Sequence, residues 1–305
     1  MQAPSHVSYV GEMQTMRIGD QHGEVAIYRV EHRAPDMTRK WYLAPEALYG
    51  DSTISRGSVS FAVDVKRNRV VVSENGALDD PDVLAGNFDL LVKNYRAVFG
   101  PNETFDGHPV RVITLINKYT GETAMRVHVD AQNDLVLERE RFASNGSVVE
   151  ETRFEHIRYS NDIPPAVFAM PAKMDVVQGD ARTKPSSDVN AIANTAGFAA
   201  RTPPYLPEGF VPVAGYVVEI NGVRTIHLLY SDGIRTVSLF EDKGPNSVDL
   251  QRYHPTAAAV GSDAAQSAEQ GSTRLLVWTA AGVHYSLVGD LTQPELEKIA
   301  DSLGE

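Results

Sequence analysis

Residues 127–159 read VHVDAQNDLVLERERFASNGSVVEETRFEHIRY, and this stretch decides the fold class of the N-terminal half. Apolar and polar residues alternate along three short runs, which is the period of a β-strand with one face on a core. The links 131–134 and 144–147 between the runs are rich in Asn, Asp, Gly and Ser, the residue types that favour turns. Strands joined by such short links pair antiparallel, so the stretch predicts a β-meander rather than parallel βαβ units.

The same alternation continues toward the N-terminus as far as Val7 and predicts one long, curved antiparallel sheet. The alternating runs have turn residues between them, as at 66–69 and 119–122. The further predicted strands are 7–17, 24–33, 39–44, 59–65, 69–74 and 110–117.

One helix is predicted to interrupt this sheet, over residues 82–99. Asp80 can cap its start, Pro81 suits the first turn, and Asp82 complements the helix dipole. Its apolar residues fall on a single stripe, as a helix lying across a sheet requires. That stripe consists of Leu84, Phe88, Leu91, Tyr95 and Val98. We therefore expect a half-barrel with this helix on its concave face.

The space between such a helix and the sheet predicts a pocket for an apolar ligand. The aromatic stretch around Trp41 and Tyr49 has two interpretations, a corner of the core or the rim of that pocket. The candidate ligand-binding residues are Trp41, Leu48, Tyr49, Phe61, Leu84, Phe88 and Leu91.

The C-terminal part is predicted to be a smaller antiparallel sheet with a terminal helix. Five strand-like runs occupy 210–220, 224–230, 234–242, 275–280 and 283–289. The stretch 257–272 is rich in small residues and is interpreted as a mobile loop. The sequence Thr292-Gln293-Pro294-Glu295 is a capping box, which predicts a helix over 296–303.

Together these patterns predict an α+β chain of two domains. Domain 1 covers 1–170 and domain 2 covers 205–305. The span 171–204 carries Pro, Ala and small polar residues without a strand period, so it is expected to be a linker with one short helix near 187–196.

Residues 228–242, LLYSDGIRTVSLFED, predict a hairpin in the second domain. Asp232-Gly233 is a strong turn signal because glycine reaches positive φ without steric cost. Apolar residues on both faces of the hairpin, with arginines nearby in an acidic domain, indicate a surface for a protein partner. The candidate partner-binding residues are Arg224, Tyr230, Asp232, Gly233, Arg235 and Phe240.

Composition excludes several function classes. The net charge of −12 over 305 residues provides no basic surface for nucleic acid. The chain has no cysteine, so it forms neither disulfides nor zinc-thiolate sites. The short motifs of serine hydrolases, zinc proteases and nucleotide-binding loops are absent, which favours a protein that is not an enzyme and needs no cofactor. His128 and Asp130 share a strand face and could hold a metal, but a solvated strand end accounts for them as well, and no metal site is predicted.

Five stretches of this chain resemble the RseB/MucB family, extracytoplasmic regulators of envelope-stress sigma factors. They are 6–19, 127–159, 205–215 (YLPEGFVPVAG), the hairpin 228–242, and 277–303, which together span most of the chain. The resemblance implies a first domain similar to the lipoprotein carriers LolA and LolB, able to shelter acyl chains. It also implies a second domain that helps to grip an anti-sigma factor.

The function that this resemblance implies is that of a regulator without enzymatic activity. Such a protein binds the periplasmic segment of a membrane-anchored anti-sigma factor and senses lipid or mislocalised lipoprotein. A periplasmic lipoprotein or lipid carrier is the alternative. Either role implies a periplasmic or other extracytoplasmic location, with the signal or anchor absent from this chain, and a homo-oligomer is left open.

Overall fold

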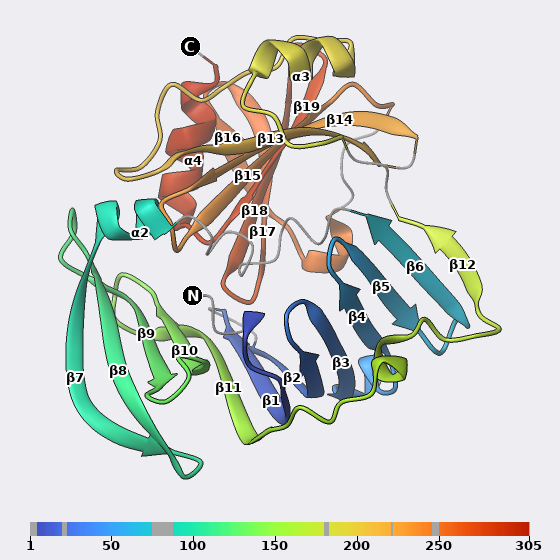
Figure 1. Cartoon of the computed structure of the whole chain (residues 1–305). Helices are drawn as coiled ribbons and strands as arrows, with labels where there is room; N and C mark the ends of the chain where they lie inside the picture. The colour runs from blue at the N-terminus through green and yellow to red at the C-terminus, as the bar shows by residue number, and fades with distance from the viewer. Residues whose placement is uncertain are drawn as a thin grey trace. The chain divides into compact units, whose positions relative to one another are not determined.

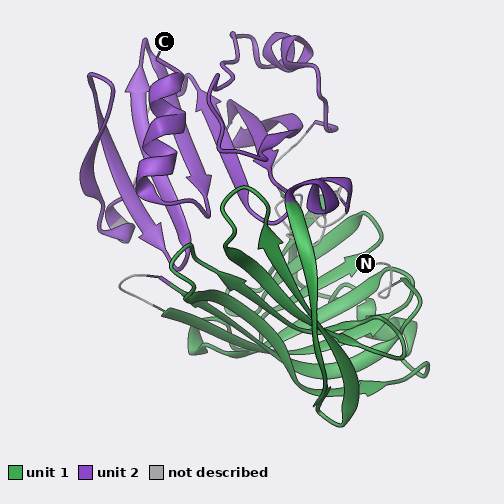
Figure 2. Ribbon diagram, turned by 90° about the vertical axis from the view of Figure 1, so that its left-hand side faces the viewer, with its two compact units in different colours: residues 1–18, 23–86, 95–179 green, residues 19–22, 87–94, 180–305 purple. Residues whose placement is uncertain are grey.

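The computed structural model describes residues 5–19, 23–74, 88–179, 183–220, 222–245 and 250–304. The chain forms two compact units, each built around its own large sheet (Figures 1 and 2). Unit 1 comprises residues 1–18, 23–86 and 95–179. Unit 2 comprises 19–22, 87–94 and 180–305. Two short segments from the N-terminal half of the sequence therefore belong to unit 2.

Unit 1 is a 12-stranded sheet with the order β12-β6-β5-β4-β3-β2-β1-β11-β10-β9-β8-β7. Neighbouring strands pair antiparallel throughout, except that β12 runs parallel to β6. The strands are β1 (Tyr9–Ile18), β2 (Gly23–Arg33), β3 (Met37–Ala44), β4 (Ser52–Arg56), β5 (Val59–Asp64), β6 (Arg69–Glu74), β7 (Tyr95–Phe105), β8 (His108–Asn117), β9 (Thr123–Asp130), β10 (Val136–Phe142), β11 (Val148–Tyr159) and β12 (Asp175–Gln178).

The predicted half-barrel with a helix on its concave face is wrong. The helix that forms, α2 (Phe88–Asn94), is seven residues long and belongs to unit 2. Tyr95 already begins strand β7 and pairs with Asn117 of β8. Among the described residues unit 1 contains no α-helix, so the fold is two open sheets and mostly β rather than α+β. Leu84 and the first part of the predicted helix lie outside the described residues.

The physical reason for this error is that the apolar residues at the end of the predicted helix fit a strand as well. Tyr and Val have a high β propensity, and Tyr95 begins β7, where it pairs with Asn117 of β8. The hairpin that β7 forms with the next strand, β8, therefore decides the structure of residues 95–105 against the local helical period.

Two apolar clusters hold unit 1 together. One contains Tyr28, Val30, Leu137 and Phe154. In the other, Ile163 and Phe168 from the segment after β11 pack against the buried side chains of β4, β5 and β6. That segment includes the short 3-10 helix η3 (Pro165–Phe168), and a second one, η2 (Glu46–Leu48), follows β3. The chain after β11 thus covers part of one sheet face.

Unit 2 is a seven-stranded antiparallel sheet with the order β13-β14-β15-β19-β18-β17-β16. The five strand-like runs of the sequence form strands, but the predicted mobile loop at 257–272 is wrong, because it forms the hairpin β16–β17. In β17 the small side chains of Ala265 and Ser267 alternate with exposed residues and are buried, so even a strand rich in alanine turns one face toward the core. The strands are β13 (Val211–Ile220), β14 (Val223–Ser231), β15 (Thr236–Asp242), β16 (Thr256–Val260), β17 (Asp263–Gln270), β18 (Thr273–Ala280) and β19 (Val283–Gly289).

Two helices pack on one face of this sheet. α3 (Val189–Ala196) is capped by Asp188, whose carboxylate accepts two backbone N–H groups, and it buries Ile192. α4 (Gln293–Ser302) begins at Thr292 with the predicted capping box, which is confirmed, and it buries Leu296 and Ile299. The short 3-10 helix η4 (Gln251–Tyr253) precedes β16. The main core of unit 2 lies between the two α-helices and the sheet.

Candidate functional site: the β14–β15 turn and its cover

The turn between β14 and β15 is built around one buried carboxylate. Asp232 is 1% exposed, and its Oδ1 accepts the backbone N–H groups of Ile234 (2.9 Å) and Arg235 (2.7 Å). Its Oδ2 accepts the Nε–H of Arg235 at 2.9 Å. Gly233 has a φ of +101°, the positive φ that the sequence predicted. A residue with a side chain rarely adopts that conformation, which explains why glycine occupies this position. The turn is therefore held by hydrogen bonds among its own residues.

Helix α2 covers this turn. The Nδ2 of Asn94 donates one hydrogen bond to the carbonyl of Gly209 (2.8 Å) and another to the carbonyl of Asp232 (2.9 Å). A Cβ placed on Gly233 would meet the backbone nitrogen of Leu91 at 2.9 Å, so only glycine allows the helix to approach this closely. The sequence did not predict a role for Asn94, which is 1% exposed.

Arg235 is held by its neighbours and is only partly accessible, with 26% of its side chain exposed. Its guanidinium lies 5.3 Å above the ring of Phe210, and one nitrogen is 3.9 Å from Glu295 of α4. Together with the bond to Asp232, these contacts fix the side chain. Arg235 therefore stabilises the turn as well as contributing charge to its surface.

The other candidate residues of the hairpin lie apart from the turn. Arg224 is exposed near the start of β14, with one guanidinium nitrogen 3.4 Å from the carbonyl of Thr195. Tyr230 is buried in the main core, and burial, with the charge of Glu241 as a smaller cause, raises its pKa. Phe240 is on the other sheet face, where its ring stacks on His227 at 4.2 Å. The structure thus brings together Asp232, Gly233 and Arg235, but not the full set.

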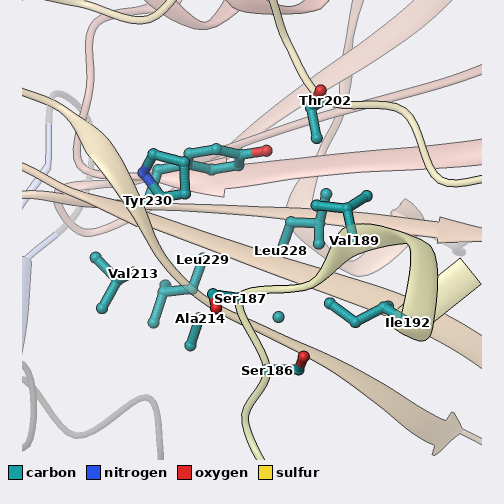
Figure 3. Close-up of a pocket in the computed structure, with 12 residues that line it drawn as sticks. Ser186, Ser187, Val189, Ile192, Thr202, Val213, Ala214, Leu228, Leu229 and Tyr230 are labelled. Atoms are coloured by element: carbon teal, nitrogen blue, oxygen red, sulfur yellow. The ribbon is translucent and has the colours of Figure 1, made fainter.

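A small cavity of about 60 Å³ lies between α3 and strands β13 and β14 (Figure 3). The segment before α3 pairs with the edge of β13, through hydrogen bonds of 2.9 and 2.8 Å between Ser186 and Gly215. Sequence reasoning missed this cavity; the only signal was a glycine inside a strand, which often marks a close approach of another segment. The lining residues are Ser186, Ser187, Val189, Ile192, Thr202, Pro212, Val213, Ala214, Gly215, Leu228, Leu229 and Tyr230.

The candidate residues of the predicted apolar pocket are divided between the two units, and the pocket stays a prediction. Trp41, Leu48 and Tyr49 are 43%, 38% and 63% exposed, on β3, on η2 and directly after η2. Phe61 is 5% exposed and belongs to the core of unit 1. Phe88 and Leu91 are on α2, which belongs to unit 2.

Unit 1 carries a cluster of charges on strands β1, β10 and β11. The carboxylate of Glu150 lies within 3.5 Å of three guanidinium groups, those of Arg17, Arg139 and Arg141. Nearby, His128 contacts Glu138 at 2.9 Å, and burial raises the pKa of that carboxyl. Within the part of the chain that the structure describes, no three ligating side chains gather in a way that could hold a metal ion. Nor does any described helix have the length and apolarity to span a membrane.

Known proteins provide a match to this architecture in structure but not in sequence. No protein-family model matches the chain, and no curated protein matches it. A crystal structure of MucB in complex with MucA(peri) covers 99% of this chain and 94% of its own chain, with 17% identity and a TM-score of 0.65. The fold is that of MucB.

Two further structures agree with this match. The Pseudomonas aeruginosa MucA/MucB complex covers 98% of this chain and 93% of its own, with 16% identity and a TM-score of 0.64. A crystal structure of MucB covers 99% and 93%, with 14% identity and a TM-score of 0.56. At these identities the likeness to MucB establishes the fold, including both units, and leaves the binding partner of this chain to be tested.

Proposed function

We propose that this protein is a MucB-like binding regulator, which holds the periplasmic segment of a membrane-anchored anti-sigma factor. The observation that carries this proposal is the match in fold over nearly the whole of both chains, with MucB structures that contain MucA. Both units take part in that match, so the proposal does not rest on a shared domain alone. It places the chain outside the cytoplasm.

The features of unit 2 support a role in binding rather than catalysis. The buried carboxylate of the candidate site, that of Asp232, accepts hydrogen bonds from Ile234 and Arg235 at both of its oxygens. A side chain engaged in this way is suited to shaping a surface and not to transferring a proton. Arg224 is exposed and offers a positive charge to an acidic partner segment.

The experiment is a calorimetric titration of the full chain with the purified periplasmic segment of the anti-sigma factor from the same genome. We expect saturable binding, and weaker binding by Arg224→Glu, because reversing a charge at an interface rim slows association. Lys184→Glu makes the same charge change at another exposed position of unit 2 and is the matched control. Absence of binding by the folded parent protein, checked by circular dichroism, would overturn the proposal.

Acyl-chain binding by unit 1 is a second candidate function. Five exposed apolar side chains on neighbouring segments favour it, because such side chains are a common feature of lipid-binding surfaces. Lys66, next to one of them, donates to the carbonyls of Glu46 and Ala47 and so links the turn after β5 to η2. We define this β3–η2 patch as Trp41, Leu43, Leu48, Tyr49 and Val65.

A further inference from the structure

Helix α2 is too short to be stable by itself. Seven residues are well below the length at which an isolated helix forms in water, and the sequence FDLLVKN contains β-branched and turn-forming residues. Figure 2 colours this helix with unit 2, apart from the residues that flank it in sequence. The helix therefore exists because it is docked, and undocking and unfolding are one event.

The surface of unit 2 beneath α2 binds one particular side chain, that of Asn94. Two main-chain carbonyls, those of Gly209 and Asp232, accept from the single Nδ2 of Asn94. Four residues earlier, Leu90 is 8% exposed, whereas Phe88 and Val92 are 60% and 52% exposed. Residues four apart lie on the same side of a helix, so Leu90 and Asn94 form the buried side. The surface fits a short helix with an apolar residue followed four positions later by a side-chain amide.

The backbone at Gly233 adds a shape requirement. Its missing side chain lets a helix backbone come close, with Leu91 nitrogen only 2.9 Å from the position of an added Cβ. The turn itself does not depend on α2, because Asp232 and Ser231 already satisfy its backbone groups. When α2 leaves, the turn and the acceptor carbonyl of Asp232 therefore keep their support.

We propose that α2 is an autoinhibitory cover, which occupies a helix-binding surface of unit 2 in place of a partner's helix. The partner's segment carries an apolar residue and, four positions on, an Asn or Gln. This inference extends the proposed function by naming the surface that takes the partner. The chain also passes from unit 2 to unit 1 between Asn94 and Tyr95 with no residue in between.

The test uses the full chain and a fluorescent synthetic peptide of residues 86–96, GNFDLLVKNYR, followed by fluorescence anisotropy. In Asn94→Ala, α2 loses its hydrogen bonds to the carbonyls of Gly209 and Asp232, so the surface beneath it is uncovered in a larger fraction of the molecules. We expect this variant to bind the peptide roughly tenfold more tightly than the parent protein does, since a site that is rarely open loses affinity in proportion. Asp89→Ala, an exposed change in the same helix, is the matched control and should behave like the parent.

Two results would overturn the proposal: equal binding by the parent and Asn94→Ala, or binding by neither. A peptide with Ala in place of Asn94 should bind neither protein tightly.

Native-state hydrogen exchange of the parent protein provides the test if the Asn94→Ala variant does not fold. The amides of residues 91–94 should exchange through a local opening, unaffected by low denaturant. Exchange of these amides only with global unfolding would contradict a removable cover. Neither measurement involves the anti-sigma segment, so this inference and the proposed function fail separately.

Discussion

The backbone N–H of Arg201 points at the carboxylate of Glu241, 3.1 Å from each of its two oxygens. Glu241 is 0% exposed, and the guanidinium of Arg201 is directed to the carbonyl of Leu303 at the end of α4. Arg201 thus links the segment that leads into β13 both to Glu241 of β15 and to the end of the C-terminal helix.

Burial raises the pKa of Glu241 from 4.5 to about 7, although the N–H and the charge of Arg201 oppose the shift. The group is protonated more readily in the folded state, so its contribution to stability is full below pH 4.5 and is lost as the pH rises through 7. Glu241→Gln should remove this loss, so the free energy of unfolding of the variant relative to the parent protein should be higher at pH 8 than at pH 4 by up to about 3 kcal/mol. Urea unfolding of both proteins at the two pH values measures this change. The same difference between variant and parent at both pH values would contradict the assignment.

Gly215 should not tolerate a methyl group. A Cβ at this position would lie 2.3 Å from Cδ1 of Ile192 and 3.0 Å from Cδ2 of Leu228, so the buried side chain of Ile192, or α3 with it, must shift. Gly215→Ala should lower the free energy of unfolding by about 1–3 kcal/mol, the usual cost of overpacking a core. Gly23→Ala is the control, because a Cβ at Gly23 would lie 3.6 Å from its nearest neighbour, the backbone oxygen of Arg17, and the φ of Gly23 is not positive. Equal stability of the two variants in thermal unfolding would count against the contact.

Glu150 should be more important for stability than other glutamates of the same strand. Its removal leaves three guanidinium groups without their shared counter-charge, and the side chain of Arg141 is only 10% exposed. We expect Glu150→Gln to cost about 2 kcal/mol, less than a fully buried pair because Arg17 is half exposed. Glu155→Gln is the matched control, since its pairing with Arg153 is exposed and should cost under about 0.5 kcal/mol. Chemical denaturation that finds the same loss for both would refute this.

The β3–η2 patch should decide whether unit 1 takes up acyl chains. Trp41→Glu places a charge among exposed apolar side chains and should reduce binding of a fluorescent fatty acid at least about tenfold, because burying a charge against a hydrocarbon chain is costly. Tyr119→Glu changes an exposed aromatic residue in the turn between β8 and β9 and serves as the control. Uptake that is the same in the parent and both variants would remove the lipid-binding candidate.

Local chemistry predicted the elements that depend on neighbours in sequence. The turn at Asp232-Gly233 and the capping box at Thr292 are determined by side chains within three residues of each other, so their signals are complete in the sequence. Strand β7 was wrongly predicted as a helix because Tyr95 and Val98 are three residues apart, a helical spacing, whereas the hairpin with the next strand, β8, makes the segment a strand.

Sequence reasoning found only part of the candidate site. The hairpin was found, but its cover was not, because Asn94 binds carbonyls that are 115 and 138 residues away along the chain. Hydrogen bonds to main-chain atoms leave no pattern in the residues that accept them. Contacts of this kind are invisible without the fold.

The place of β1 between β2 and β11 has a consequence for biosynthesis. A chain made from its N-terminus onward exposes one edge of β1 until residues 148–159 have emerged, because its second neighbour is β11. An open strand edge is a template for pairing with other chains. Nascent chains arrested before residue 148 should therefore depend on chaperones, and the protein should begin to fold late in synthesis rather than strand by strand.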